Sequence, residues 1–282
     1  MSLFITSLNS GSNGNCYYIG NDTEAVLIDA GISCSETEKR MSLLGLSMHK
    51  VKAVFISHEH TDHIKGLPTL SQKYQLPVYI TDITLRHSGI QLGPLLPIHF
   101  KAFEPIQVGG LLVTAFPKQH DAEDPHSFII HFNGVTVGVF TDIGAHCRNV
   151  IKYFGQCDAA FLEANYDETL LENGRYPYFL KNRIRGGKGH LSNDQALEIF
   201  TKYRPPFMTH VLLSHLSKDN NCPVKAKELF DVHAARTNII VASRYEQTPV
   251  YTIHKNTQPF TIAKKRKALF NRMQLSLFGE GS

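Results

Sequence analysis

Short apolar runs separated by polar turns dominate the beginning of the chain. The runs at 3–8, 16–20 and 25–31 have the length and the β-branched and aromatic content of strands. The glycine-rich segment 10–15, which lies between the first two runs, is typical of a tight hairpin connection. We therefore expect the chain to begin with three strands.

After these strands the apolar pattern alternates between strand and helix. Ser33 and Glu36 are placed to cap a helix that runs to Leu44. The apolar run 51–57 predicts a buried strand, and the spacing of the apolar positions that follow predicts a helix over about 63–74.

The rest of the chain repeats this mixture of strands and helices. Further strands are predicted at 99–104, 111–119, 127–132, 135–142, 159–165, 208–217, 239–243 and 249–253. Further helices are predicted over about 145–155, over 192–203 with a Ser-x-x-Gln capping box, and near 224–237. Two β-rich halves, each covered by helices, indicate an α/β protein built as a four-layer αββα sandwich.

Composition and charge divide the chain at about residue 260. With 282 residues and 42% hydrophobic content, the chain can bury one large core or two modest ones. The formal net charge is +4, but 261–282 hold five basic residues and one acidic residue, so the other 260 residues carry 24 of each sign. We expect one folded domain over 1–260 and a basic C-terminal tail over 261–282.

Cysteine usage and hydropathy indicate a cytoplasmic protein. The five cysteines are odd in number and far apart, and they form no C-x-x-C pair, which is typical of reduced thiols. The N-terminus lacks a basic region that leads into a long apolar run, so no secretion signal is predicted. No stretch approaches the roughly 18 uninterrupted apolar residues of a membrane span, and we expect no membrane contact.

The strongest candidate for chemistry follows the predicted strand 51–57. The segment SHEHTDH places imidazoles at His58, His60 and His63 and a carboxylate at Asp62. Imidazole nitrogen and carboxylate oxygen suit Zn²⁺ and also accept Mn²⁺ or Fe²⁺. A loop that leaves a strand lets the rigid sheet hold such ligands in place.

This H-x-H-x-D-H segment resembles the signature of the metallo-β-lactamase superfamily, whose fold is the sandwich predicted above. The resemblance implies three further metal ligands: His120, Asp142 as the carboxylate that bridges two metals, and His215. It implies two divalent metal ions, Zn or Mn with Fe as an alternative. The ligands then divide into two sets: His58, His60 and His120 for one ion, and Asp62, His63 and His215 for the other.

Each of the three later positions has a simpler alternative. His126 is close enough in sequence to compete with His120. His210 competes with His215, for which the S-H-L-S context decides. Asp142 can be a plain cap of the helix that follows it.

The segment GHLS at 189–192 narrows the predicted chemistry. This short motif, a histidine followed by Leu-Ser and placed twenty-odd residues before His215, resembles the one in the phosphodiesterase branch of the superfamily, which includes the RNase Z enzymes. The resemblance implies that His190 acts as a general acid on the leaving oxygen, while Asp62 also orients the nucleophile. The alternative is that His190 merely precedes the helix cap Ser192. Glu163 is expected to support the ligands rather than to catalyse.

A basic segment upstream of this histidine is a candidate for nucleic-acid binding. Arg183, Arg185 and Lys188 lie in a glycine-containing stretch, which we expect to be a loop that grips phosphates. Arg244, which follows a predicted strand, is a weaker candidate. The alternative is an ordinary solvated turn.

The last residues carry a different motif. QLSLF at 274–278 resembles the short peptide with which bacterial DNA-processing proteins bind the sliding clamp. The resemblance implies that four side chains contact the clamp: Gln274, Leu275, Leu277 and Phe278. The preceding KKRK can contact DNA phosphates. The alternative is a terminal amphipathic helix that docks on the body through Leu269, Phe270, Met273 and Leu277.

Several longer segments resemble the YycJ or WalJ branch of the superfamily, whose members are described as 5′-to-3′ DNA exonucleases. The segments occur in family order: 7–19, 57–67, 176–196 and 212–221. The resemblance implies a catalytic domain that removes nucleotides from DNA. Together with the tail motif, it leads us to expect an enzyme of DNA repair that the clamp recruits. Two alternatives remain open. One is a small-molecule esterase, thioesterase or cyclic phosphodiesterase, and the other is a non-catalytic, clamp-associated protein that binds DNA.

Overall fold

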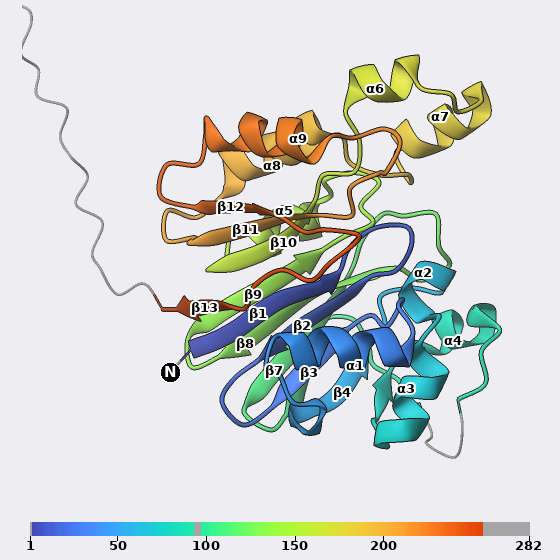
Figure 1. Cartoon of the computed structure of the whole chain (residues 1–282), viewed down its shortest axis with the longest axis vertical. Coiled ribbons are helices and arrows are strands. Elements are labelled where there is room, and N and C mark those ends of the chain that lie inside the picture. Colours follow the sequence, from blue (N-terminus) through green and yellow to red (C-terminus); the bar gives the residue numbers. More distant parts are fainter. Residues whose placement is uncertain (1, 93–96, 256–282) are drawn as a thin grey trace, which may run out of the picture.

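A computed structural model describes residues 2–92 and 97–255, whose strands form two sheets (Figure 1). The first sheet has six strands, in the order β13 (Tyr251–His254), β1 (Ser2–Asn9), β2 (Cys16–Gly20), β3 (Ala25–Ile28), β4 (Val51–Phe55) and β5 (Val78–Tyr79). The second has seven, in the order β12 (Asn238–Val241), β11 (His210–Ser214), β10 (Ala159–Glu163), β9 (Val135–Phe140), β8 (His126–Phe132), β7 (Leu111–Pro117) and β6 (Pro105–Val108).

Helices cover the outer faces of both sheets (Figure 1). On the side of the first sheet lie α1 (Cys34–Leu43), the 3₁₀ turn η1 (Met48–Lys50), α2 (Thr61–Ile64), α3 (Leu67–Tyr74) and α4 (Asp82–Ser88). On the side of the second lie α5 (Arg148–Phe154), α8 (Asn193–Tyr203) and α9 (Pro223–Asp231), while α6 (Glu168–Asn173) and α7 (Tyr178–Arg185) project beyond the layers. None of these helices is long and apolar enough to cross a membrane.

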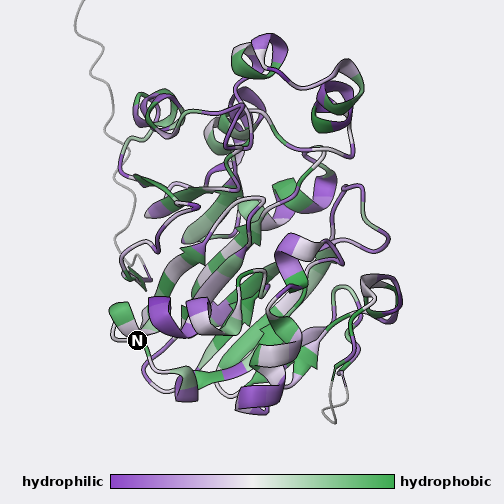
Figure 2. Cartoon of the chain, turned by 45° about the vertical axis from the view of Figure 1, so that its right-hand side comes forward, coloured by the Kyte–Doolittle hydropathy of each residue, from purple (hydrophilic) through white to green (hydrophobic). Residues whose placement is uncertain are grey.

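Apolar side chains fill the spaces between the layers. The central core joins the two sheets and includes Phe55, Phe128 and Phe161. Separate cores lie beneath the helices, with Met41 on the first side and Phe200 on the second. Figure 2 shows the apolar positions concentrated on the strands between the helical layers. The predicted αββα sandwich is therefore confirmed.

Two helix starts follow the predicted capping chemistry. Ser33 accepts a hydrogen bond from the backbone N–H of Glu36 at the start of α1. Ser192 and Gln195 form the reciprocal capping box at the start of α8. Local side-chain chemistry was sufficient to place both helix starts.

Other predicted elements are wrong or have different bounds. The segment 99–104 forms no strand, since Phe103 has a positive φ of 68° that interrupts extended backbone, and β6 begins at Pro105. The single helix predicted over 63–74 is two helices, α2 and α3. The chain turns between them at Gly66, where a Cβ atom would lie 1.9 Å from the carbonyl oxygen of Ile32. The helices predicted over 145–155 and 224–237 are the shorter α5 and α9.

The direction of the strands determines where functional side chains can gather. β3, β4 and β5 are parallel, and so are β9, β10, β11 and β12. The carboxyl ends of parallel neighbours meet at one edge of a sheet, which is a common place for binding sites. The loops after β4, β9 and β11 carry His58, Asp142 and His215, so both sheets contribute residues to one site.

Candidate metal centre

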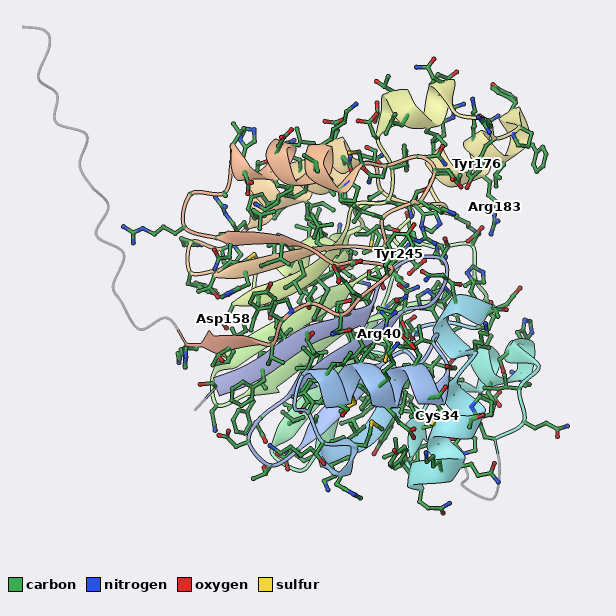
Figure 3. All side chains as sticks on the ribbon, viewed as in Figure 1. Cys34, Arg40, Asp158, Tyr176, Arg183 and Tyr245 are labelled. Carbon is green, nitrogen blue, oxygen red and sulfur yellow. The ribbon has the colours of Figure 1, made fainter. Side chains whose placement is uncertain are left out.

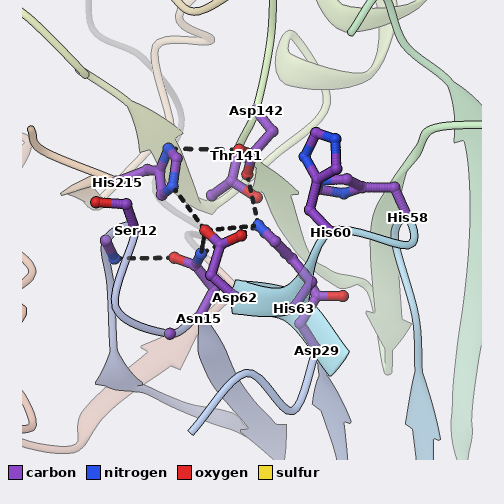
Figure 4. Close-up of polar contacts among 12 residues, drawn as sticks. Ser12, Asn15, Asp29, His58, His60, Asp62, His63, Thr141, Asp142 and His215 are labelled. Atoms are coloured by element: carbon purple, nitrogen blue, oxygen red, sulfur yellow. Dashed lines mark hydrogen bonds and ion pairs between the residues drawn. The ribbon is translucent and has the colours of Figure 1, made fainter. Parts of the chain in front are cut away.

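The structure brings the predicted ligands together at this edge of the sandwich. Figure 4 labels them except for His120. Their ligand atoms form two groups, in each of which all atoms lie within 4.8 Å of one another: His58, His60 and His120 in one, and Asp62, His63 and His215 in the other. Asp142 forms further groups with members of both. The two groups contain the same residues as the two predicted ligand sets, and Asp142 lies between them, with oxygens 3.2 Å from His63 Nε2 and 3.8 Å from His120 Nε2.

Buried contacts orient the histidines that follow β4. Asp29 Oδ2 lies 2.7 Å from Nδ1 of His63 and accepts a hydrogen bond from Ser57 Oγ at 2.9 Å. Ser57 Oγ in turn lies 2.8 Å from Nδ1 of His58. These contacts occupy Nδ1 of both rings and leave Nε2 for the centre of the cluster. Such outer partners fix the ring orientation of metal-binding histidines.

The second sheet orients its two histidines in the same way. His120 Nδ1 lies 3.0 Å from the carbonyl oxygen of Gly189. His215 Nδ1 lies 3.2 Å from Glu163 Oε1, and Asn165 Nδ2 donates to the carbonyl oxygen of His215 at 2.7 Å. Both rings therefore direct Nε2 toward the cluster, although their anchors come from different strands and loops.

Buried polar atoms without partners test whether these residues fit metal ions. Among the described residues, eight buried side-chain atoms have no hydrogen-bond partner. Three of them, His120 Nε2, His215 Nε2 and Asp142 Oδ2, have only ion-pair contacts of 3.2 to 3.8 Å within the site. Such a group costs about 1–3 kcal/mol when it is left unpaired. All three atoms belong to the predicted ligands, and cations between them would satisfy all three. The donor set of imidazole and carboxylate suits divalent zinc or manganese.

The backbone is strained where it presents these side chains. Asp29, Asp142 and His215 have positive φ angles of 62°, 54° and 58°, a region that non-glycine residues rarely adopt. Each residue lies at the carboxyl end of a strand, directly after it or one residue removed. Strain of this kind persists where the surroundings hold the residue in a functional geometry.

The electrostatics divide the histidines into two classes. Burial lowers the pKa of His63 and His215, but nearby carboxylates, chiefly Asp142, outweigh burial and raise it, well above the ordinary value for His63 and to about 10 for His215. Burial lowers the pKa of His58 well below its ordinary value and that of His120 to about 4. Protons are thus favoured at two of the rings that face carboxylates, and a divalent cation would displace them.

The opening hairpin loop holds Asp62. The backbone N–H of Asn15 donates to the carbonyl oxygen of Asp62 at 2.7 Å, and Asn15 Nδ2 donates to Asp62 Oδ2 at 3.2 Å (Figure 4). Asn15 Nδ2 also lies 3.0 Å from His63 Nε2. The glycine-rich segment 10–15 is therefore the connection between β1 and β2 that we predicted, and it also forms one wall of the site.

Glu163 links the candidate general acid to the metal cluster. It is fully buried at the end of β10, and its Oε1 lies 2.7 Å from His190 Nδ1 and 3.2 Å from His215 Nδ1. Its Oε2 accepts from the backbone N–H groups of Ile143 and Leu191. Burial opposes ionisation, yet His190 and His215 lower the pKa of Glu163 to about 2. The carboxylate thus supports both histidines, which agrees with the supporting role that we expected.

The alternative histidines lie elsewhere in the described structure and belong to none of the ligand groups. His126 begins β8, where its ring packs edge-on against Phe100. His210 begins β11, at the end of the strand opposite His215, and its Nδ1 lies 2.9 Å from Thr209 Oγ1.

The predicted phosphate-binding residues lie near the cluster but already have contacts. The loop expected around Arg183 and Arg185 is wrong, because both side chains belong to the last turn of α7. Arg183 Nε donates to Asp121 Oδ2 at 2.6 Å, and Arg185 donates to a carboxylate of α6. Lys188 is exposed in the loop after α7. Arg244 Nη2 donates to Ser12 Oγ at 3.2 Å, beside the opening hairpin loop.

Sequence reasoning missed three supporting residues: Asp29, Asn15 and Asn165. Asp29 follows β3 directly, so a polar residue at the end of a buried strand was the available signal. Asn15 directly precedes β2, and Asn165 follows the end of β10 by two residues. The proposed clamp-binding residues 274–278 lie outside the described residues, so that motif and the division at residue 260 stay predictions.

Comparison with known proteins agrees with this geometry. The beta-lactamase superfamily domain matches residues 24–216. The exodeoxyribonuclease YycJ of Bacillus anthracis is 34% identical over 224 residues, which are 78% of this chain and 85% of the relative. The exodeoxyribonuclease WalJ of Streptococcus pneumoniae is 29% identical over 219 residues, which are 76% of this chain and 81% of the relative.

A solved structure supports the same fold. The metallo-β-lactamase fold protein YhfI of Bacillus subtilis superposes with a TM-score of 0.70 at 18% identity, over 89% of this chain and all of that chain. At this identity the similarity concerns the fold alone. The family match, the curated relatives and the histidine–aspartate cluster lead to one assignment. This chain belongs to the beta-lactamase superfamily and is a metal-dependent hydrolase of the metallo-β-lactamase fold.

Proposed function

We propose that this chain is an exodeoxyribonuclease that removes nucleotides from the 5′ ends of DNA. The observation that carries the proposal is the convergence of two ligand groups on Asp142, beside a histidine that Glu163 holds. The names of the YycJ and WalJ relatives support DNA as the substrate. The polarity rests on the sequence resemblance to that branch.

In this proposal seven side chains hold two divalent ions, Zn²⁺ or Mn²⁺ with Fe²⁺ as a further candidate: His58, His60, Asp62, His63, His120, Asp142 and His215. When bound, the ions supply an activated water and a positively charged clamp for a phosphodiester. Asp62, whose side chain is 22% exposed, also orients the attacking water. Its bonds to Asn15 fix that carboxylate before substrate arrives.

His190 is the proposed general acid. Its side chain is 21% exposed, so it lies on the open side of the cluster. Because Glu163 occupies Nδ1, the Nε2–H of His190 is left to donate a proton to the departing 3′ oxygen.

We further propose that the tail recruits the enzyme to DNA in repair. The QLSLF motif supports a contact with the sliding clamp through four residues: Gln274, Leu275, Leu277 and Phe278. A pentapeptide buries little surface, but a tether raises the effective concentration of the enzyme at clamp-bound DNA.

The test uses the purified protein with Mn²⁺ or Zn²⁺ on single-stranded and duplex DNA, either 5′-phosphorylated or 5′-blocked. Asp62→Ala and a chain that ends at Gln258 are assayed beside the wild type. We expect nucleotides from accessible 5′ ends, a loss of more than about 100-fold in Asp62→Ala, and near-normal activity of the shortened chain on free DNA. Loading the clamp on the DNA should stimulate only the full chain.

Two outcomes would replace the proposal. If both metals leave every DNA intact while a small ester or cyclic phosphodiester is consumed, the chain is a small-substrate hydrolase. If nothing is consumed, and DNA or clamp binding survives His60→Ala, the chain is a binding protein with a structural metal site.

A further inference from the structure

Helix α7 presents two adjacent aromatic rings to solvent. Tyr178 and Phe179 are 73% and 74% exposed, and α7 buries none of its eight residues. In Figure 1 the helix stands with α6 beyond the four layers. Large apolar side chains that are exposed side by side mark binding surfaces more often than single exposed residues do.

The same segment is strongly basic. Residues 174–190 contain five lysines and arginines and no acidic residue. Arg183 and Arg185 form ion pairs with Asp121 and Glu172. Within the part of the chain that the structure describes, Arg175 and Lys188 have no carboxylate partner. The rings therefore lie in a segment whose unpaired charge is positive, which favours a polyanionic partner.

The C-terminal end of α7 is connected to the metal cluster through His190 and Asp121. The backbone N–H of His190 donates to the carbonyl oxygen of Ile184 at 2.8 Å. Arg183, which Figure 3 labels, donates to Asp121, whose Oδ1 lies 3.2 Å from His120 Nε2. At 1.5 Å per residue the start of α7 lies about 10 Å along the helix from this end. That distance equals about three stacked nucleotides at roughly 3.4 Å each.

We propose that Tyr178 and Phe179 form a stacking platform for unpaired bases of the DNA strand, about three nucleotides from the reacting phosphodiester. The inference rests on the proposed function, whose substrate class it narrows to DNA with a single-stranded end. Every base has a flat π face, so stacking on such rings tolerates any sequence. Nearby cations hold the phosphates between the bases. Basic charge beside the rings favours this partner over an apolar protein surface.

The test measures binding of the full, Mn²⁺-loaded chain to a fluorescent 12-nucleotide single strand with phosphorothioate links, which resist cleavage. We expect the double variant Tyr178→Ala/Phe179→Ala to bind about tenfold more weakly. Replacing both rings by leucine keeps apolar surface but removes the flat faces, and should weaken binding almost as much. Leu43→Ala on α1, at a side chain that is 65% exposed, is the matched control and should bind within twofold of wild type.

Cleavage assays on unmodified DNA separate this inference from the proposed function. The alanine pair should raise KM on the 12-mer, and should raise it less on a dinucleotide that is too short to reach the rings. The platform is ruled out if the alanine pair binds the 12-mer within twofold of wild type. It is also ruled out if the leucine pair binds as tightly as wild type, which indicates a site for an apolar protein segment. If the wild type cleaves no DNA, the proposed function is wrong. The binding measurement still decides whether Tyr178 and Phe179 bind single-stranded DNA.

Discussion

The metal cluster and helix α7 adjoin each other, yet they are built in opposite ways. In the cluster, His58, His63 and Asp142 are almost fully buried, and bonds from separate loops hold them. Helix α7 buries none of its residues, and exposed ion pairs connect it to its neighbours. Chemistry on a phosphodiester requires ligands in fixed positions, and burial with several partners provides this. Capture of a flexible strand requires accessible rings and charges instead.

Because of this contrast, substitutions in the metal cluster should destabilise the fold more than substitutions on α7. Removing one partner from a buried polar network leaves another group unsatisfied at a cost of about 1–3 kcal/mol. Breaking an exposed ion pair costs only about 0–1 kcal/mol. Substitutions in the cluster should therefore change both stability and rate, whereas substitutions on α7 should change binding alone.

Of the tests of this contrast, the largest effect is expected in the buried region, from Glu163→Gln, which removes the carboxylate between His190 and His215. The amide cannot accept hydrogen bonds from both histidines and both backbone N–H groups, so His190 loses its fixed orientation. We expect kcat on DNA to fall about 10- to 100-fold. A p-nitrophenyl phosphodiester, whose leaving group departs without a proton, should lose much less. Rates on the two substrates are compared, with Glu172→Gln on α6 as an exposed control. Equal losses on both substrates would contradict the role of Glu163 through His190.

The next expected effect is on stability rather than on rate, and it follows removal of the metal. In the metal-free protein, the raised pKa of His215 gives stability that is present below about pH 6.5 and lost as the pH rises toward about 10. The lowered pKa of His120 gives the opposite effect, because stability is lost as the pH falls from about 6.5 to about 4.

Thermal unfolding of EDTA-treated protein should therefore show greatest stability near neutral pH. Protein reloaded with Mn²⁺ should keep its melting temperature into the alkaline range, because the ions replace the protons. A metal-free protein whose melting temperature does not fall between neutral pH and about pH 10 would contradict this account of His215.

The smallest expected effect is on α7, in Arg183→Ala. Loss of the exposed pair with Asp121 should change the free energy of unfolding by no more than about 1 kcal/mol. If Arg183 contacts a phosphate, DNA binding weakens similarly for all sequences, and the slope of log K against log salt concentration falls by about 1. Lys202→Ala, which removes an exposed ion pair on α8, serves as the control. A large loss of stability would show that α7 is part of the core after all.

The fold and the ligands could be predicted for different reasons. The strands could be predicted because their apolar runs are short and bounded by turn residues. The starts of α1 and α8 could be predicted because the capping residues lie within one turn of each other. The ligands of the SHEHTDH segment lie in one loop, so their spacing is itself a signal. Helix α7 was not predicted, since no apolar face buries it and the glycines that follow it, at 186, 187 and 189, are typical of a loop.

The sequence alone determined the donor chemistry of this protein: three histidines and an aspartate after a strand, with further histidine and aspartate residues at later strand ends. Only the tertiary structure decided which side-chain atoms point into the cluster. Asp29 lies 34 residues before the histidine that it orients, and Glu163 lies 52 residues before His215. No local pattern encodes such pairs, because parallel strands bring their carboxyl ends together regardless of separation in the chain. The fold also decides which histidines reach the cluster. His210 stands at the start of β11, at the opposite end of the strand from the cluster, and the ring of His126 packs against an aromatic ring of the central core, so both lie outside it.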